Sequence, residues 1–182
     1  LTTGDSTLVE EVGEPGILQV AASLENDSEH PLARSIQAAA EEQKLALLHV
    51  DNFRAMPGLG VSGRVTGRET FIGSWRLVEQ ENLALSDTLK QERTRLEQDG
   101  LTVIHVCWSG KVQGLLALAE EVRPTAKPAL AEMKQKYFTA QVLTGDSAAA
   151  GRSLSEKLGV SVQSELLPHN KVEVVEAAVK EA

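Results

Sequence analysis

Three short segments carry residue types that could bind a phosphorylated ligand. The first, residues 28–33 (SEHPLA), places His30 directly before Pro31, which suits the first turn of a helix because its missing N–H has no partner there. Glu25, at the end of a predicted preceding helix, can return to the same corner. A histidine at a helix start is also typical of a capping or solvated residue, so this segment alone leaves both interpretations open.

The second segment, residues 57–63, satisfies the pattern G-x-G-x-x-G. The dinucleotide-binding version of this pattern needs a strand before it and a helix after it, so that a pyrophosphate meets the helix N-terminus. Here Val61 and Val65 begin a strand pattern, which argues against that use. Gly58 and Gly60 still allow a flat ligand to approach the backbone closely, and a plain turn before a strand explains them equally well.

The third segment is a Thr144-Gly145-Asp146 turn that follows an apolar strand. Open α/β sheets bind ligands at the carboxyl ends of their parallel strands, where a threonine hydroxyl and a glycine N–H can meet a phosphoryl group. Lys171, in a later predicted helix, can offset the charge of the same anion. A helix cap is the alternative interpretation of this turn.

Composition restricts the classes of function. The chain has 182 residues, 42% of them hydrophobic, with 26 acidic against 18 basic residues and a net charge of −8. No run of Lys and Arg could neutralise a nucleic-acid backbone, so nucleic acid is not an expected partner. The single Cys107, on a predicted hairpin strand, is interpreted as structural, and no Cys/His spacing predicts a metal site.

Residues up to about 119 predict mixed α+β structure. A helix with apolar residues at helical spacing precedes one that starts at Pro31, and short strands then alternate with a helix that Ser86 can cap and Gly100 can end. Ser109-Gly110 between two apolar strands is a hairpin signal. The predicted helices span residues 16–25, 31–43 and 86–100, and the predicted strands span residues 61–66, 70–72, 101–108 and 111–119. The expected sheet is mostly antiparallel, after a polar opening.

Beyond Glu120 helices and strands alternate, which predicts parallel βαβ units. The expected helices span residues 125–136, 147–158 and a segment from about 170, and the expected strands span residues 139–143 and 160–162. Two architectures in one chain predict two domains.

The order of the three segments resembles the large cytoplasmic loop of heavy-metal P-type ATPases, the copper, zinc and cadmium pumps. The matching motifs are SEHPL, G-x-G-x-x-G and TGD, with Arg123-Pro124 and residues 167–171 (LPHNK) as further similar segments. The resemblance implies an antiparallel nucleotide-binding domain at 9–119 and an incomplete haloacid-dehalogenase-like parallel α/β phosphorylation domain at 120–182. Residues 1–8 would begin the phosphorylation-domain segment.

The resemblance also implies two sets of site residues. His30 would orient the nucleotide, Glu25 would lie near the adenine, and Ser74 stands where the family has an asparagine. The nucleotide-binding set is Glu25, His30, Gly58, Gly60 and Ser74, and the set that faces the phosphoryl group is Thr144, Gly145, Asp146 and Lys171.

Some family motifs differ or are missing. Leu1-Thr2 would end the family's DKTGTLT, whose aspartate is the nucleophile, and the magnesium-binding GDGxNDxP is not in the sequence, so the Mg²⁺ site is expected to be incomplete. The family's TGDN or TGDG has Ser147 at its fourth position, and the acidic residue before Arg123-Pro124 is Glu120. A start at Leu1 and the lack of an apolar run of ~18 residues predict a soluble excised piece that does not insert into a membrane.

The expected function is that of an ATP-binding cytoplasmic part of a bacterial inner-membrane-like pump, which couples ATP hydrolysis through an aspartyl phosphate to metal export. The LPHNK segment favours copper. Its expected partners are ATP or ADP, Mg²⁺, the actuator domain and the membrane helices of the same pump, and the piece is expected to be monomeric and inactive by itself. The alternative is a non-catalytic adenine-nucleotide-binding or docking module. A dehalogenase-type phosphatase would need an Asp-x-Asp motif, which the sequence lacks.

Overall fold

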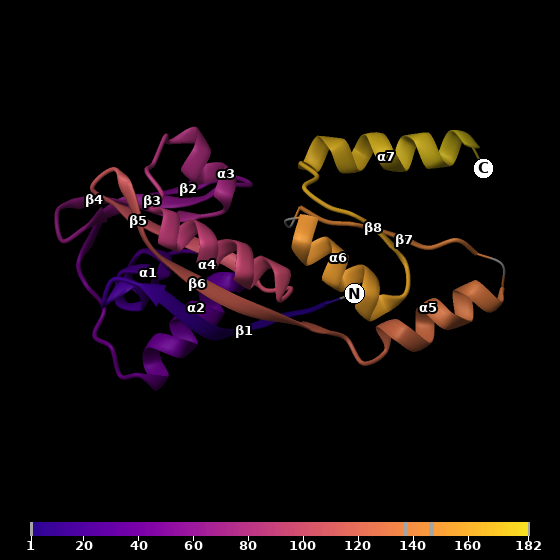
Figure 1. Cartoon of the computed structure of the whole chain (residues 1–182), viewed down its shortest axis with the longest axis horizontal. Helices are drawn as coiled ribbons and strands as arrows, with labels where there is room; N and C mark the ends of the chain where they lie inside the picture. Colours follow the sequence, from indigo (N-terminus) through magenta and orange to yellow (C-terminus); the bar gives the residue numbers. More distant parts are fainter. Residues whose placement is uncertain (1, 137, 146–147, 182) are drawn as a thin grey trace.

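The computed structural model describes residues 2–136, 138–145 and 148–181. Figure 1 shows two parts side by side, a larger one built on a six-stranded sheet and a smaller one that contains the last three helices. None of the helices within the described residues is long and apolar enough to cross a membrane.

The six-stranded sheet is antiparallel throughout, in the order β1-β6-β5-β4-β3-β2. Its strands are β1 (Thr2–Gly13), β2 (Val50–Met56), β3 (Gly60–Val65), β4 (Arg68–Gly73), β5 (Thr102–Trp108) and β6 (Lys111–Val122). The β5–β6 hairpin turns at Ser109-Gly110, as predicted. The expectation of a mostly antiparallel sheet is therefore confirmed.

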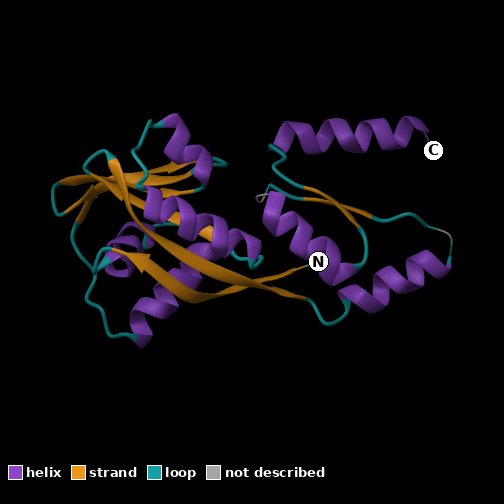
Figure 2. Cartoon of the chain, in the orientation of Figure 1, coloured by secondary structure: helices purple, strands orange, loops and turns teal. Residues whose placement is uncertain are grey.

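Helices cover both faces of this sheet (Figure 2). The alternation of side chains along β5 divides the core, because Ile104 and Val106 pack with α1 and α2 while Val103 and Cys107 pack with α3 and α4. The helices are α1 (Ile17–Glu25), α2 (Pro31–Glu42), α3 (Trp75–Gln80) and α4 (Asp87–Gln98). Ser86 caps α4 as predicted, since its hydroxyl accepts a hydrogen bond from the Leu89 N–H at 3.3 Å.

Three elements were not predicted. The polar opening, for which no element was predicted, is the strand β1, which pairs with β6. Its register shifts between Leu8 and Glu10, which interrupts the period-2 alternation, so Leu8 packs against one core and Val12 against the other. β2 and α3 were likewise missed, because the burial along β2 does not alternate with period 2 and α3 has only 6 residues.

The smaller part has parallel βαβ connectivity. β7 (Gln141–Leu143) pairs in parallel with β8 (Ser161–Gln163), and α6 (Ala148–Leu158) connects them. α5 (Ala126–Gln135) and α7 (Pro168–Glu181) complete this part, whose core is formed by Ala126, Leu130, Val142 and Leu158. The predicted parallel alternation is confirmed.

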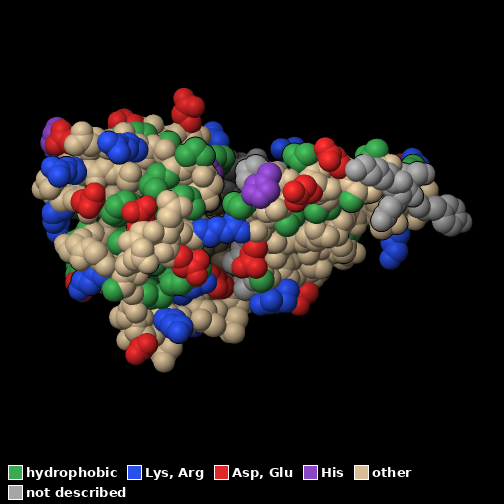
Figure 3. Space-filling view, turned by 90° about the horizontal axis from the view of Figure 1, so that it is seen from above, with side chains coloured by type: hydrophobic (Ala, Val, Ile, Leu, Met, Phe, Trp, Pro, Cys, Tyr) green, Lys and Arg blue, Asp and Glu red, His purple; other side chains and the backbone are tan. Residues whose placement is uncertain are grey.

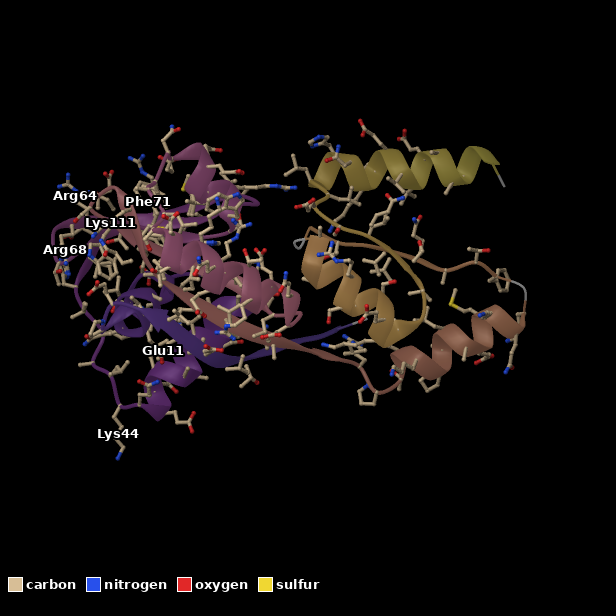
Figure 4. The ribbon with its side chains drawn as sticks, viewed as in Figure 1. Glu11, Lys44, Arg64, Arg68, Phe71 and Lys111 are labelled. Carbon is tan, nitrogen blue, oxygen red and sulfur yellow. The ribbon has the colours of Figure 1, made fainter. Side chains whose placement is uncertain are left out.

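The two parts meet at the end of the large sheet near α3 and α4. The Arg76 guanidinium of α3 donates a hydrogen bond to the Glu165 carbonyl oxygen, and Gly100 after α4 lies so close to Ser153 of α6 that an added Cβ would overlap its side chain. Arg64, Arg68 and Lys111 lie at the opposite end of the sheet (Figure 4). These exposed basic side chains are therefore remote from the junction.

Candidate functional site

A cavity of about 940 Å³ lies at the junction of the two parts. It is lined by the α1–α2 corner, the glycine turn before β3, the start of α3, part of β5 and the loop before α7. Seen from above, basic side chains and a histidine lie near this junction (Figure 3). The cavity brings together seven of the nine predicted site residues: Glu25, His30, Gly58, Gly60, Ser74, Gly145 and Lys171.

Of the other two predicted residues, Thr144 is not on the lining. Thr144 lies next to Gly145, but its backbone N–H donates to the Gln163 carbonyl at 2.8 Å and its carbonyl accepts from the Leu166 N–H at 3.0 Å. The main chain of Thr144 therefore ties β7 to the loop after β8. Asp146 lies outside the described residues, as does Ser147.

The α1–α2 corner is held by local hydrogen bonds. Glu25 ends α1, and its carbonyl accepts from the Ser28 N–H at 3.0 Å. His30 is the N-cap of α2, where its Nδ1 accepts from the Leu32 N–H at 3.2 Å, and Pro31 occupies the first turn. Because Nδ1 accepts, the proton of the neutral ring is on Nε2, which leaves a hydrogen-bond donor beside the cavity.

The glycine turn joins two antiparallel strands, and no helix follows it. Gly60 pairs with Gly73 across β3 and β4, and the Ser74 N–H donates to the Leu59 carbonyl at 2.8 Å. This context excludes the dinucleotide-binding use of the G-x-G-x-x-G pattern, as the sequence predicted. The turn instead forms one wall of the cavity.

Three buried polar atoms on cavity-lining residues have no hydrogen-bond partner within the described part of the chain. They are Glu25 Oε2, Ser74 Oγ and His105 Nε2. A buried polar atom without a partner costs about 1–3 kcal/mol, so such atoms are rare without a reason. All three atoms belong to residues that line one cavity, which favours a polar ligand there.

Burial changes the acid–base chemistry of three groups. Desolvation raises the pKa of the Glu25 carboxyl above its usual 4.5, and a hydrogen bond with the Ser28 side chain partly offsets this. Desolvation lowers the pKa of His105 to about 4, so its ring is neutral at pH 7. Burial raises the pKa of the fully enclosed Cys107 thiol to about 12, which is consistent with the predicted structural role.

Glu25→Gln is expected to make stability less dependent on pH. The raised pKa means that the folded chain binds this proton more tightly than the unfolded chain, so the contribution of Glu25 is fully present below pH 4.5 and is lost as pH rises through the folded pKa. Thermal melts at pH 5 and pH 8 measure the effect. The difference in stability between the variant and the wild type should shift in favour of the variant from pH 5 to pH 8. An equal difference at both pH values would contradict this assignment.

Sequence reasoning missed the wall formed by α3, α4 and β5. The Arg93 guanidinium lies 4.0 Å from the Trp75 ring centre and forms an ion pair with Glu97 at 2.9 Å. The other neighbour of Trp75 is His105, with ring centres 5.7 Å apart. The one signal for this wall was a histidine within the apolar strand that ends at Trp108.

The carboxylates and histidines do not gather into a metal centre within the described ranges. No group of three or more His, Cys, Asp or Glu side chains there could hold a metal ion. The described residues by themselves thus do not fit a Mg²⁺ site.

A family model described as haloacid dehalogenase-like hydrolase matches residues 5–182. The chain belongs to this family. Among its relatives, it is 36% identical over 180 residues to the copper-exporting P-type ATPase B of Archaeoglobus fulgidus, covering 96% of this chain and 26% of that protein. It is 35% identical over 164 residues to the silver exporting P-type ATPase of Salmonella typhimurium, covering 90% of this chain and 20% of that protein.

Solved structures agree with these sequence relatives. The catalytic domain of the CPx-ATPase CopB-B, studied for conformational changes upon nucleotide binding, matches this member of the dehalogenase-like family with a TM-score of 0.77 and 25% identity, covering all of this chain and 63% of that one. The predicted resemblance to heavy-metal P-type ATPases is therefore confirmed. The chain spans about a quarter of the length of its Archaeoglobus relative.

Proposed function

We propose that the chain is the adenine-nucleotide-binding catalytic part of a heavy-metal-exporting P-type ATPase, with copper the favoured ion. One observation carries the proposal. The histidine corner, the glycine turn and the TGD loop were each singled out in the sequence for ligand chemistry, and residues of all three line one cavity. The copper- and silver-exporting relatives give this cavity its chemical context.

Each wall of the cavity would have its own part in binding. The Nε2–H of His30 would donate to the base, while the Glu25 carboxyl would meet the adenine amino group. Gly58 and Gly60 present backbone to the flat ring. Gly145 and Lys171, on the far wall, would face the phosphates, where an N–H and an ammonium offset negative charge.

The domain division also belongs to this proposal, with a nucleotide-binding domain at 9–119, part of a phosphorylation domain at 120–182, and residues 1–8 in the latter. The strand register supports these boundaries, because Leu8 pairs with Leu118 and Ser6 pairs with Glu120. The boundary after residue 8 and the boundary after residue 119 thus lie opposite each other on the paired strands β1 and β6. These two strands run toward the smaller part in Figure 1.

In the whole pump an aspartate would attack the γ-phosphate of ATP, with Mg²⁺ as the companion ion and the actuator domain and membrane helices as partners. The residues of this chain would hold the nucleotide, exclude water from it and keep its phosphates beside Lys171. Since the 182-residue sequence contains no DKTG motif, the phosphate acceptor is not among these residues.

The 182-residue chain is expected to bind ATP and ADP weakly, with a Kd on the order of 1 mM, and to form no acyl phosphate. Calorimetric titration measures the binding, and transfer of labelled γ-phosphate to the protein measures the chemistry. Steady ATP hydrolysis by highly purified chain, unchanged by His30→Ala, would contradict the proposal. Absence of any nucleotide binding would instead favour a protein-docking module.

A further inference from the structure

His105 is a buried polar residue with no assigned role. Its side chain is 1% exposed in the middle of β5, and it lines the cavity. It pairs with Gly73 of β4, which in turn pairs with Gly60 of β3. His105 therefore lies in the same cross-strand row as Gly60 of the glycine turn. Because neighbouring strands lie about 4.8 Å apart, the two residues are about 10 Å apart.

The two ring nitrogens of His105 have different environments. Nδ1 lies 3.1 Å from the Gly73 carbonyl oxygen, and because a carbonyl can only accept, Nδ1 carries the proton. A pKa of about 4 keeps the ring neutral at pH 7. Nε2 is then an unprotonated acceptor, buried and without a partner among the described residues.

A second unpartnered polar atom lies close along the chain. Ser74 follows Gly73 directly, lines the cavity and has a buried hydroxyl with no partner in the described structure. Ser74 is the N-cap residue of α3, yet its side chain makes no capping hydrogen bond. The Trp75 ring, held under the Arg93 guanidinium, packs against His105 and limits its reorientation.

The chemistry of His105 Nε2 and Ser74 Oγ restricts which group of a bound nucleotide they can contact. An acceptor nitrogen needs a donor, and phosphate oxygens at neutral pH offer none. The donors of ATP are the amino group of the base and the two ribose hydroxyls. The unpartnered Glu25 Oε2 at the α1–α2 corner already provides an acceptor for the amino group. The two adjacent ribose hydroxyls, each able to donate and accept, fit a serine hydroxyl and a histidine acceptor that belong to the lining of the same cavity.

We propose that His105, together with Ser74, forms a ribose-hydroxyl subsite, in which Nε2 accepts a hydrogen bond from the 2′- or 3′-hydroxyl of the nucleotide. The inference rests on the proposed function, since it places the sugar of the same ligand. It makes His105 a specificity-determining residue that distinguishes ribonucleotides from deoxynucleotides. The hydrogen bond to the Gly73 carbonyl fixes the ring that performs this recognition.

The test compares ATP, 2′-deoxyATP and 3′-deoxyATP by calorimetric titration of the 182-residue chain. Wild type is expected to bind at least one deoxynucleotide about fivefold to tenfold more weakly than ATP, as the loss of one buried hydrogen bond implies. His105→Asn places an amide near Nδ1 but nothing at Nε2, so its ATP affinity should fall to the deoxynucleotide level. His105→Gln places an oxygen near Nε2 and should keep most of the preference.

Cys107→Ala is the matched control, because Cys107 is buried on the same face of β5 and does not line the cavity. It should lower the melting temperature without changing the ratio of ATP to deoxynucleotide affinity. Wild type that binds all three nucleotides equally, or His105→Asn that keeps the preference, overturns the inference and leaves the proposed function standing; a buried water is then the partner of Nε2. Wild type that binds none of the three overturns both.

Discussion

Gly60→Ala is expected to destabilise the chain by about 3 kcal/mol and to abolish nucleotide binding. Gly60 has a φ of +150° and faces Gly73 across β3 and β4, where an added Cβ would overlap the Ile72 carbonyl oxygen and lie 2.6 Å from the Gly73 Cα. Both neighbours are backbone, which cannot move aside without opening the strand pair. Urea denaturation followed by tryptophan fluorescence measures the loss.

Gly58→Ala is the matched control for Gly60→Ala, since Gly58 lines the same cavity. Its φ is +75°, but an added Cβ would meet nothing within 4 Å. The cost is therefore limited to the left-handed backbone conformation, about 1 kcal/mol. Equal destabilisation by the two substitutions would show that the tight approach of Gly60 to β4 is not what holds the turn.

His30→Ala is expected to reduce ATP affinity about tenfold or more and stability by about 1 kcal/mol. The two effects have different origins. Stability falls because Nδ1 no longer accepts the hydrogen bond from the Leu32 N–H, and affinity falls because the Nε2–H donor beside the cavity is removed. Calorimetry and thermal melts measure them separately.

His30→Asn separates these roles, because an asparagine caps a helix well but does not reach as far as an imidazole. It should keep the stability of wild type and still lose the ATP affinity. An asparagine variant that binds ATP as tightly as wild type would reduce His30 to a helix cap, which is the alternative that its sequence position left open.

The parts of the fold that were predicted are those whose signals are local. Ser109 and Gly110 have φ values of 55° and 73°, the left-handed pair that a two-residue hairpin turn requires, and this preference is encoded in the two residues themselves. Ser86 and Pro31 likewise mark helix starts through their own chemistry. Such signals do not depend on distant segments of the chain.

β1 could not be predicted in the same way. Its polar and charged sequence is typical of a loop, and it becomes a strand because β6, more than a hundred residues later, provides its hydrogen-bond partners. The parallel β7–β8 pair was predictable because alternating helices and strands restrict the connection between neighbouring strands.

The candidate site likewise contains residues with local sequence signals and residues whose role depends on distant segments. His30, Gly58 and Gly60 lie in recognisable segments, and the cavity unites them. His105 was passed over because its strand pattern predicts only that it is inside. That its Nε2 is an unprotonated acceptor depends on the hydrogen bond from Nδ1 to the Gly73 carbonyl, which is a cross-strand contact.

Titration of the isotope-labelled chain with ATP, followed by amide chemical shifts, tests the central claim most directly. If the histidine corner and the glycine turn form two walls of one nucleotide site, then amides of residues 25–32 and of residues 58–61 should shift together and saturate with a single Kd. Shifts confined to one of the two segments, or none at several-fold above 1 mM ATP, would contradict it.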